Sequence, residues 1–338
     1  MKRALIGIYS ILLISTITSC SRAKIADACG EAVLWRGKSR TSVLGVEWNH
    51  DGSKLAVLTP PRIEIWGRNG CEWESITTME APYAYTIDWH PDQDLLAIGQ
   101  GINEENLLIW NTETGETVFS QTRPRPSDAI GALVLSNLEW SSDGSYIVSD
   151  SSLSHESFLR WDLAEEDALP QTLISMLPSE VPYTSVEFEL SPSGDLLLSV
   201  GREASLWVIR IWEVENQKAI FTIEGNYPIE WGPTDNQFAG TRDNQILIWN
   251  LETTGIVTTF DKHSTGIQAI SWNRTASMIA SADWDGNLKV WNPETGAEYL
   301  DNVRFPGVSR VAWSPDGTEL AVAGGQELVI LKLDLPSQ

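Results

Sequence analysis

The sequence predicts an all-β protein built from seven repeated units of about four short strands each. Apolar and polar residues alternate in short runs bounded by Asn, Asp and Gly, a pattern typical of strands joined by tight turns. The pattern returns roughly every 40–50 residues, a period typical of propellers and related repeat architectures. These observations favour a closed ring of blades, because closure leaves no sheet edge open to aggregation.

The repeat is clearest between Lys262 and Gly296. Its three strand-like runs are Ile267–Trp272, Met278–Ala282 and Leu288–Trp291. An aromatic residue ends the first run and Trp ends the third, and we name these two positions the first and second anchors of a unit. The runs are separated by turns rich in Asp and Gly, because Gly tolerates positive φ and Asp hydrogen-bonds its own backbone.

The two anchors count the units. The first anchors are Trp48, Trp89, Trp140, Phe188, Trp231, Trp272 and Trp313. The second anchors are Trp66, Trp110, Trp161, Trp212, Trp249 and Trp291, with Leu331 in the seventh unit. Together they use 12 of the 16 Trp residues, so the high Trp content follows from the repeat itself.

The turns beside the anchors resemble those of a known repeat family. The second anchor is followed by Asn or Asp in four units, and the first anchor opens turns of the form WNHDG, WSSDG or WSPDG. On these residues the chain from about 31 to 334 resembles the WD40-repeat β-propeller family. The resemblance implies a seven-bladed propeller of four-stranded antiparallel blades, with a hydrogen-bonded tetrad in each blade. In the sixth unit His263, Ser281, Asp285 and Trp291 match the tetrad, whereas the other units lack the His.

The last unit lacks a strand. Only three runs are recognisable after Val308, at Val308–Trp313, Glu319–Ala323 and Glu327–Leu333. We expect Glu31–Gly37, an isolated strand-like run before the first unit, to supply the fourth strand by pairing with Glu327–Leu333. This would close the ring with an N-terminal strand in the last blade. The alternative is that Glu31–Gly37 forms a loop.

The N-terminus resembles the signal of a bacterial exported lipoprotein. Lys2 and Arg3 precede an apolar stretch, Ala4–Ile17, that is too short for a comfortable transmembrane helix. The sequence ITSC at 17–20 then matches a lipobox, which implies cleavage before Cys20 and its diacylation. Multiple acyl chains anchor stably, since each buried methylene contributes about 0.8 kcal/mol. The alternatives are an ordinary signal peptide and an uncleaved anchor.

This interpretation divides the chain into four parts. They are a signal peptide at residues 1–19, a lipid-anchored tether at 20–30, the propeller at 31–334 and a tail at 335–338. We expect an exported protein held by lipid at the cell envelope. Ser21 does not resemble the Asp that retains lipoproteins in the inner membrane, so the outer membrane is favoured if the cell has one, and otherwise the outer face of the plasma membrane.

Two cysteines remain once Cys20 carries lipid. Cys29 precedes the proposed closing strand, and Cys71 lies at the turn before the fourth strand of unit one. Both fall on the same rim of adjacent blades, and disulfides persist in exported proteins. We therefore consider Cys29 and Cys71 candidates for a disulfide that clamps the seam of the ring. The alternative is two separate thiols.

Charge and motifs exclude several functions. The chain has 46 acidic and 23 basic side chains, a formal net charge of −23, which disfavours nucleic acid as a partner. No G-x-S-x-G motif, phosphate loop or ligand-like spacing of the four His residues occurs, so we expect no catalytic residues, no cofactor and no metal site. The alternative is an enzyme whose active site is assembled from distant loops of the propeller.

Loop lengths indicate a binding face. Units two to four have longer segments between their second and third strands, and the links into units three and four are long as well. In a four-stranded blade both loop types emerge on one face, and insertions on one face often mark a binding side. Arg123 and Arg125, each followed by Pro, would lie there. The alternative is that this Pro-spaced pair belongs to a solvated linker.

Aromatic residues are the other binding candidates, because Trp, Tyr and Arg are enriched at binding hot spots. Trp284 lies in a tight turn that has no structural need for Trp. Tyr85 and Tyr227 begin first strands near the mouth of the central channel, and Tyr183 and Trp207 lie in unit four. Each of them could instead pack beneath a loop.

The sequence therefore favours a non-catalytic, monomeric scaffold that binds another protein at the cell envelope through one loop face. The alternative is a propeller that binds or acts on a small molecule or saccharide in its central channel, where Tyr85, Tyr227 and acidic neighbours would lie. A flat aromatic face would favour the scaffold, whereas a deep polar channel with paired carboxylates would favour the second function.

Overall fold

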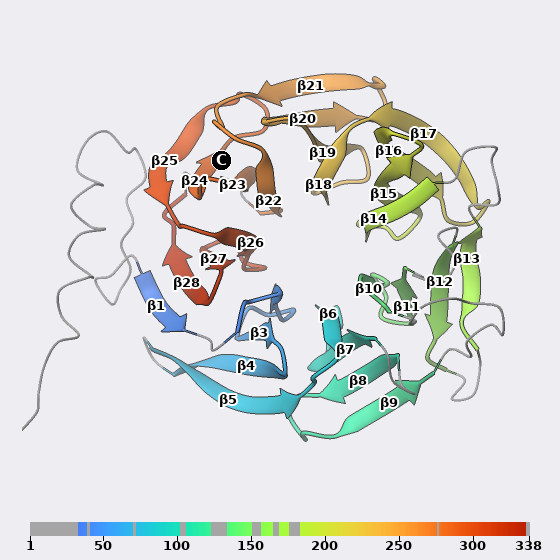
Figure 1. Cartoon of the computed structure of the whole chain (residues 1–338), viewed down its shortest axis with the longest axis vertical. Coiled ribbons are helices and arrows are strands. Elements are labelled where there is room, and N and C mark those ends of the chain that lie inside the picture. Colours follow the sequence, from blue (N-terminus) through green and yellow to red (C-terminus); the bar gives the residue numbers. More distant parts are fainter. Residues whose placement is uncertain are drawn as a thin grey trace, which may run out of the picture.

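The protein is a ring of seven four-stranded antiparallel sheets around a central axis (Figure 1). This computed structural model describes residues 33–38, 41–69, 72–101, 106–122, 134–150, 157–164, 169–175, 183–275 and 277–335. All secondary structure in these ranges is β-strand or turn, which confirms the seven-bladed, all-β prediction.

In blades one to six the strands follow the order of the chain from the channel outward. Blade one comprises β2 (Gly45–Trp48), β3 (Lys54–Thr59), β4 (Arg62–Asn69) and β5 (Glu72–Glu80). Blade two comprises β6 (Ala84–Trp89), β7 (Leu95–Gln100), β8 (Leu107–Asn111) and β9 (Thr117–Gln121). Blade three comprises β10 (Leu138–Trp140), β11 (Tyr146–Ser149), β12 (Ser157–Asp162) and β13 (Gln171–Ser175). Blade four comprises β14 (Tyr183–Leu190), β15 (Leu196–Glu203), β16 (Leu206–Glu213) and β17 (Lys218–Glu224).

The remaining blades follow the same order. Blade five comprises β18 (Asn226–Trp231), β19 (Gln237–Arg242), β20 (Gln245–Asn250) and β21 (Gly255–Phe260). Blade six comprises β22 (Ile267–Asn273), β23 (Met278–Asp283), β24 (Asn287–Trp291) and β25 (Glu298–Arg304). Blade seven comprises β26 (Val308–Trp313), β27 (Glu319–Gly324), β28 (Glu327–Lys332) and, on its outer edge, β1 (Val33–Lys38).

Ring closure by an N-terminal strand is confirmed. β1 pairs antiparallel with β28, from Lys38 opposite Glu327 to Val33 opposite Leu331. The first strand of the chain therefore completes the last blade, as Figure 1 shows beside β28. Without β1 the outer edge of β28 would carry unpaired backbone donors and acceptors.

The core lies between the blades, because both faces of each sheet pack on a neighbouring sheet. One cluster joins Leu55 and Val57 of blade one to Ala321 and Leu328 of blade seven, and similar clusters occupy the other interfaces. Second strands such as β27 are consequently buried at every position. This is why their sequences read as continuous apolar runs rather than as alternating ones.

The first anchor of blade four is Leu190, not Phe188. First anchors pair with the second residue of the next strand in blades such as two, where Trp89 lies opposite Leu96. In blade four the equivalent pair is Leu190 with Leu197. Phe188 lies two residues earlier and is buried against Phe158, with ring centroids 5.1 Å apart. An aliphatic residue therefore fills a position where the sequence suggested an aromatic one.

Blade six contains a buried hydrogen-bond network. His263 Nε2 lies 2.7 Å from Ser281 Oγ, and the indole of Trp291 donates to the same oxygen at 3.1 Å. His263 Nδ1 lies 3.2 Å from a carboxylate oxygen of Asp283. Burial lowers the pKa of His263, so a neutral ring donates from Nδ1 to Asp283 and accepts the Ser281 hydroxyl at Nε2.

The carboxylate of this network is that of Asp283, which corrects the assignment of Asp285. Asp283 is the last residue of β23, and its side chain is fully buried. Asp285 lies two residues further along, in the turn, where its side chain is exposed and its backbone N–H donates to Asp283 Oδ1 at 3.1 Å. The Trp–Ser part of the network recurs without the His in blades three and four, as Trp161 with Ser149 and Trp212 with Ser199.

We expect Ser281→Ala to destabilise the protein by roughly 2–3 kcal/mol, because it leaves two buried nitrogens, on His263 and Trp291, without their shared partner. The matched control is Ser149→Ala, which removes the hydrogen bond from the Trp161 indole and should cost about 1 kcal/mol. Chemical denaturation measures both changes. Equal losses in the two variants would contradict a cooperative network in blade six.

Deleting residues 21–38, which removes β1, should abolish cooperative unfolding, because β28 loses its outer partner and the ring opens. A deletion of residues 21–30, which leaves β1 in place, is the control and should unfold with one sharp transition. Differential scanning calorimetry distinguishes the two. A sharp transition in the longer deletion would show that β1 is dispensable for closure.

Candidate functional site

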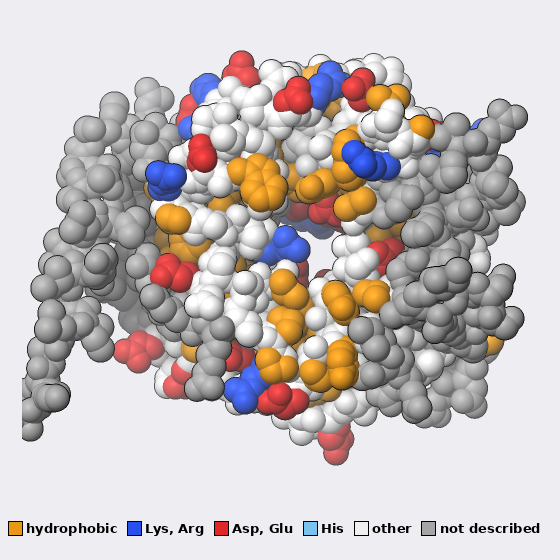
Figure 2. Space-filling view, in the orientation of Figure 1, with side chains coloured by type: hydrophobic (Ala, Val, Ile, Leu, Met, Phe, Trp, Pro, Cys, Tyr) orange, Lys and Arg blue, Asp and Glu red, His pale blue; other side chains and the backbone are white. Residues whose placement is uncertain are grey.

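The innermost strands of the seven blades surround a central channel of about 810 Å³. Figure 2 shows its opening at the centre of one face, with acidic side chains visible inside it. Successive side chains in a strand point to opposite sides, so alternate residues near the end of an innermost strand face the channel, whereas residues at its start, such as Tyr85 and Tyr227, lie at the mouth. The channel is therefore lined by equivalent positions of the seven repeats.

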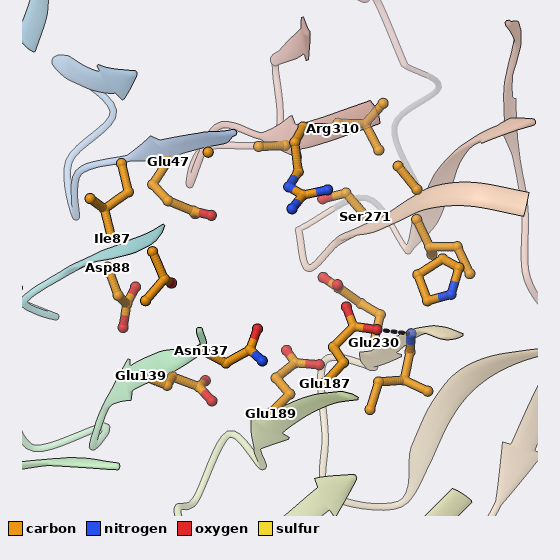
Figure 3. Close-up of a pocket in the computed structure, with 18 of the residues that line it drawn as sticks. Glu47, Ile87, Asp88, Asn137, Glu139, Glu187, Glu189, Glu230, Ser271 and Arg310 are labelled. Atoms are coloured by element: carbon orange, nitrogen blue, oxygen red, sulfur yellow. Dashed lines mark hydrogen bonds between the residues drawn. The ribbon is translucent and has the colours of Figure 1, made fainter. Parts of the chain in front are cut away.

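Among the described residues, six carboxylates line this channel. The residue directly before the first anchor faces it in every blade, and it is acidic in blades one to five. A sixth acid lies two residues earlier in blade four. We name these side chains the channel acids: Glu47, Asp88, Glu139, Glu187, Glu189 and Glu230. Figure 3 shows them pointing from different strands into one common space.

Five channel acids join neighbouring blades by accepting a backbone N–H from the next innermost strand, among them Glu187, which accepts that of Ile229 at 3.3 Å. Asp88 accepts the N–H of Trp140 at 2.7 Å, and Glu139 accepts that of Leu190 at 2.6 Å. Glu189 and Glu230 bind the first anchors of blades five and six in the same way, at 2.6 and 3.2 Å. These donors lie on the free inner edge of a sheet, where no further strand can pair with them.

The anchors add a second contact between blades. The indole N–H of Trp89 donates to the backbone carbonyl of Glu47 at 3.0 Å, and that of Trp231 donates to the carbonyl of Glu189 at 3.0 Å. Trp140 and Trp48 make the equivalent bonds to the preceding blade. Each of these Trp residues thus fixes the position of the channel-facing residue in the neighbouring blade.

Two arginines partly offset the negative charge. Arg274, just after β22, places its guanidinium 3.3 Å from a carboxylate oxygen of Glu189. Arg310 in β26 points into the same space as Glu47 and Glu187 (Figure 3). Six carboxylates therefore face two guanidinium groups, and the fully ionised channel carries net negative charge.

Burial in this crowded channel raises the pKa of every channel acid. The pKa of Glu47 rises to about 8, because burial disfavours its charge and the nearby Asp88 repels it. Burial raises the pKa values of Asp88 and Glu187 to about 7 each, and it also raises those of Glu139, Glu189 and Glu230. Near neutral pH the channel therefore holds some of its acids in protonated form.

Exposed apolar side chains gather around the channel mouth. They lie at the starts of innermost strands, in the link before β6 or in the hairpins between second and third strands, all on one face of the ring. We name this set the rim patch: Leu44, Tyr83, Tyr85, Val186, Leu206, Tyr227 and Trp284. Figure 2 shows hydrophobic side chains around the opening, and Trp284, 62% exposed, is the most exposed large apolar residue of those described.

The structure brings several predicted binding residues to this face. Tyr85 and Tyr227 both line the channel mouth. Trp207 packs edge-on against Tyr227, with ring centroids 5.3 Å apart, and the guanidinium of Arg202 lies over the Trp207 ring, 5.1 Å from its centroid. Trp284 projects from the turn between β23 and β24. Whether these side chains bind a partner stays a prediction.

Other predicted residues lie outside the described part of the chain. They are Cys20, Cys29, Cys71, Arg123 and Arg125, together with the side chain of Tyr183.

The longer segment between the second and third strands of blade four is not a loop, as the sequence suggested. Instead, β15 and β16 are each eight residues long and are joined by a tight turn at Ala204. The additional residues extend this hairpin and carry Leu206 and Trp207.

The channel acids were missed by reasoning from the sequence, although a signal exists. Four of the first anchors form the dipeptides EW or DW, at Trp48, Trp89, Trp140 and Trp231.

Within the described ranges, no group of three or more His, Cys, Asp or Glu side chains is arranged to hold a metal ion. No helix in these ranges is long and apolar enough to cross a membrane.

Comparison with known proteins agrees with this architecture. Residues 255–292 match the family model described as "WD domain, G-beta repeat". The chain carries a WD40 repeat. The matched segment runs from the outer strand of blade five through the three inner strands of blade six, which include the network around His263.

Curated relatives are WD-repeat proteins of eukaryotes. The chain is 27% identical over 217 residues to a "WD repeat-containing protein WDS homolog" of Arabidopsis thaliana, covering 61% of this chain and 37% of the relative. It is 23% identical over 290 residues to "Protein FIZZY-RELATED 3" of the same plant, covering 84% of this chain and 56% of the relative. The chain thus spans only about a third to a half of these relatives.

A solved structure shares the whole fold. A chain in the "Crystal Structure of Mitotic Checkpoint Complex" superposes with a TM-score of 0.71 at 17% identity, covering 98% of this chain and 99% of that one. At this identity the likeness concerns the fold alone.

We expect stability to fall as pH rises from 6.5 to 8.5. In the unfolded chain the carboxyl groups ionise near pH 4–4.5, whereas in the folded protein Glu47, Asp88 and Glu187 keep their protons up to about pH 7–8. The folded state therefore binds more protons than the unfolded state, and the free energy of unfolding falls as pH rises through these pKa values. The loss should be roughly 2 kcal/mol and lower Tm by several degrees.

The variant Glu47→Gln should flatten this dependence and raise Tm at pH 8.5, because glutamine resembles the protonated acid. The exposed Glu116→Gln is the matched control and should leave the pH dependence unchanged. Thermal unfolding at the two pH values measures the effect. Parallel curves for wild type and Glu47→Gln would contradict the assignment of this titration to the channel.

Proposed function

We propose that this protein is a non-catalytic scaffold that binds another protein through the face bearing the rim patch. The observation that carries the proposal is the position of the exposed apolar residues. Of the 13 large apolar side chains exposed among the described residues, seven belong to the rim patch on one face. Contiguous exposed apolar surface with aromatic anchors is typical of protein interaction sites.

The fold supports this role. Every blade is fixed to its neighbours by buried apolar clusters and, in most blades, by hydrogen bonds that the channel acids accept or the anchors donate. Such a ring holds the rim patch in place, so binding would cost little conformational entropy. The match to a WD40 repeat agrees with this role.

We further propose that the protein acts at the cell envelope, held there by lipid on Cys20. This part rests on the N-terminal sequence alone, where the basic start, the apolar stretch and ITSC at 17–20 occur in the order of a lipoprotein signal. The outer membrane is the favoured site if the cell has one. Mass spectrometry of the purified N-terminal peptide would detect a diacylated Cys20, and an unmodified Met1 would contradict this part of the proposal.

One observation favours the second candidate function, binding of a small molecule or saccharide in the channel. The channel is wide, polar and rich in carboxylates, as such a site would be. However, most of the channel acids already accept backbone N–H groups, which gives them a structural role. The exposed rim patch has no comparable structural role, and we therefore prefer the scaffold.

Crosslinking and capture from intact envelopes tests the scaffold. The double variant Leu206→Ser, Trp284→Ala should recover at least ~10-fold less of a specific partner than wild type, because it removes two exposed anchors of the rim patch. Ile220→Ser, which alters an exposed apolar residue on the outer strand β17, is the control and should retain the partner. A partner recovered equally by all three proteins would place binding elsewhere and refute this face as the site.

A further inference from the structure

The rim patch and the channel acids form one continuous surface. Four residues of the rim patch, Leu44, Tyr85, Val186 and Tyr227, also line the channel. Each precedes the first anchor of its blade by four residues, whereas the channel acids precede it by one or three. At about 3.3 Å per strand residue, the carboxylates start only about 3–10 Å below the apolar rim.

We propose that the channel mouth binds a protein segment that places a basic side chain, Lys or Arg, among the channel acids while its apolar neighbours pack on the rim patch. This inference rests on the proposed scaffold function and names the chemistry of the partner. An apolar rim alone would accept any hydrophobic segment, whereas the acidic interior selects for positive charge.

Charge complementarity carries the choice of partner. The charged groups that face the channel from the described strands are the six channel acids, Arg274 beside β22 and Arg310 on β26. Arg274 is engaged by Glu189, and Arg310 stands near Glu47 and Glu187. Asp88, Glu139 and Glu230 have no guanidinium within ion-pair distance in the described structure, although Arg274 lowers the pKa values of Glu139 and Glu230 that burial raises. An incoming cation would therefore find carboxyl groups without a direct counter-ion, which ionise beside it. An acidic segment would be repelled by the same groups.

The long side chains of Lys and Arg fit the geometry of such a site. Their apolar stems can cross the rim while the charged end reaches the carboxylates. Tyr85 and Tyr227 border the opening, and Tyr rings attract a cation placed over their faces. A shorter basic group, or one without a stem, would have to bring its polar backbone into the channel.

Binding of a cation should release protons. Because the channel acids have raised pKa values, some of them are protonated near neutral pH, and a cation beside them favours their ionised forms. By linkage, affinity for a basic segment should rise between pH 6.5 and 8.5 as these acids ionise. A purely apolar contact would show no such dependence.

Peptide arrays provide the probe. Four series of capped heptapeptides have randomised apolar neighbours and a fixed central Arg, Lys, Glu or citrulline, the uncharged counterpart of Arg. We expect peptides of the Arg or Lys series to bind at least ~10-fold tighter than their citrulline counterparts, and the Glu series to bind worst. Calorimetry of the best peptide in two buffers of different ionisation enthalpy should show proton release, with tighter binding at pH 8.5 than at 6.5.

Variants separate this inference from the scaffold itself. Asp88→Asn with Glu47→Gln should reduce the preference for Arg over citrulline at least ~5-fold while leaving the affinity for the citrulline peptide unchanged. Leu206→Ser with Trp284→Ala should weaken both peptides alike. Thermal unfolding confirms that each variant is folded at the assay temperature.

Two outcomes would overturn the inference. One is equal binding of the Arg and citrulline series at both pH values, and the other is no binding in any series. If a natural partner is nevertheless captured by wild type and lost with the rim-patch variant, the scaffold survives and only the basic partner is rejected. If that partner is captured equally by the rim-patch variant, the scaffold face fails independently of the peptides.

Discussion

The free inner edge of each blade is the constraint on which this structure depends. A four-stranded sheet that radiates from an axis leaves its innermost strand without a partner, and the unpaired backbone groups face a narrow channel. Here carboxylates from the preceding blade accept those N–H groups, and Trp indoles bond to the neighbouring carbonyls. The inner edges are thereby satisfied by side chains rather than by another strand.

This solution has an electrostatic cost. Placing six carboxylates around one channel raises their pKa values, and two guanidinium groups offset only part of the repulsion. Such arrangements are retained where function needs them, since natural proteins depart from the best local choice mainly at functional sites. The channel acids stand directly below the exposed aromatic residues of the rim patch, so the least favourable electrostatics and the most accessible apolar surface occur at one end of the ring.

The repeat made most of the fold predictable, whereas the site depended on ring geometry. Trp anchors located the blades, and the missing strand of the last unit identified the closing role of the N-terminal run. Leu190 was missed because an aliphatic residue can fill an anchor position, and Asp285 was chosen over Asp283 because a motif cannot tell which carboxylate of a turn faces inward. Glu47 and its counterparts looked like ordinary solvent-facing residues of alternating strands, and only closure turns that face into a channel.

The pairing of β1 with β28 also determines when the ring can form. These are the first and last strands of the propeller, so a ribosome must complete nearly the whole chain before blade seven has all its strands. Pairing across almost the full sequence is slow, because the loop to be closed is long. Until then blades one to six stand as an open arc, with the apolar faces that later meet blade seven still uncovered. During synthesis this interval is the one in which the chain is most exposed to misassembly or to helper proteins.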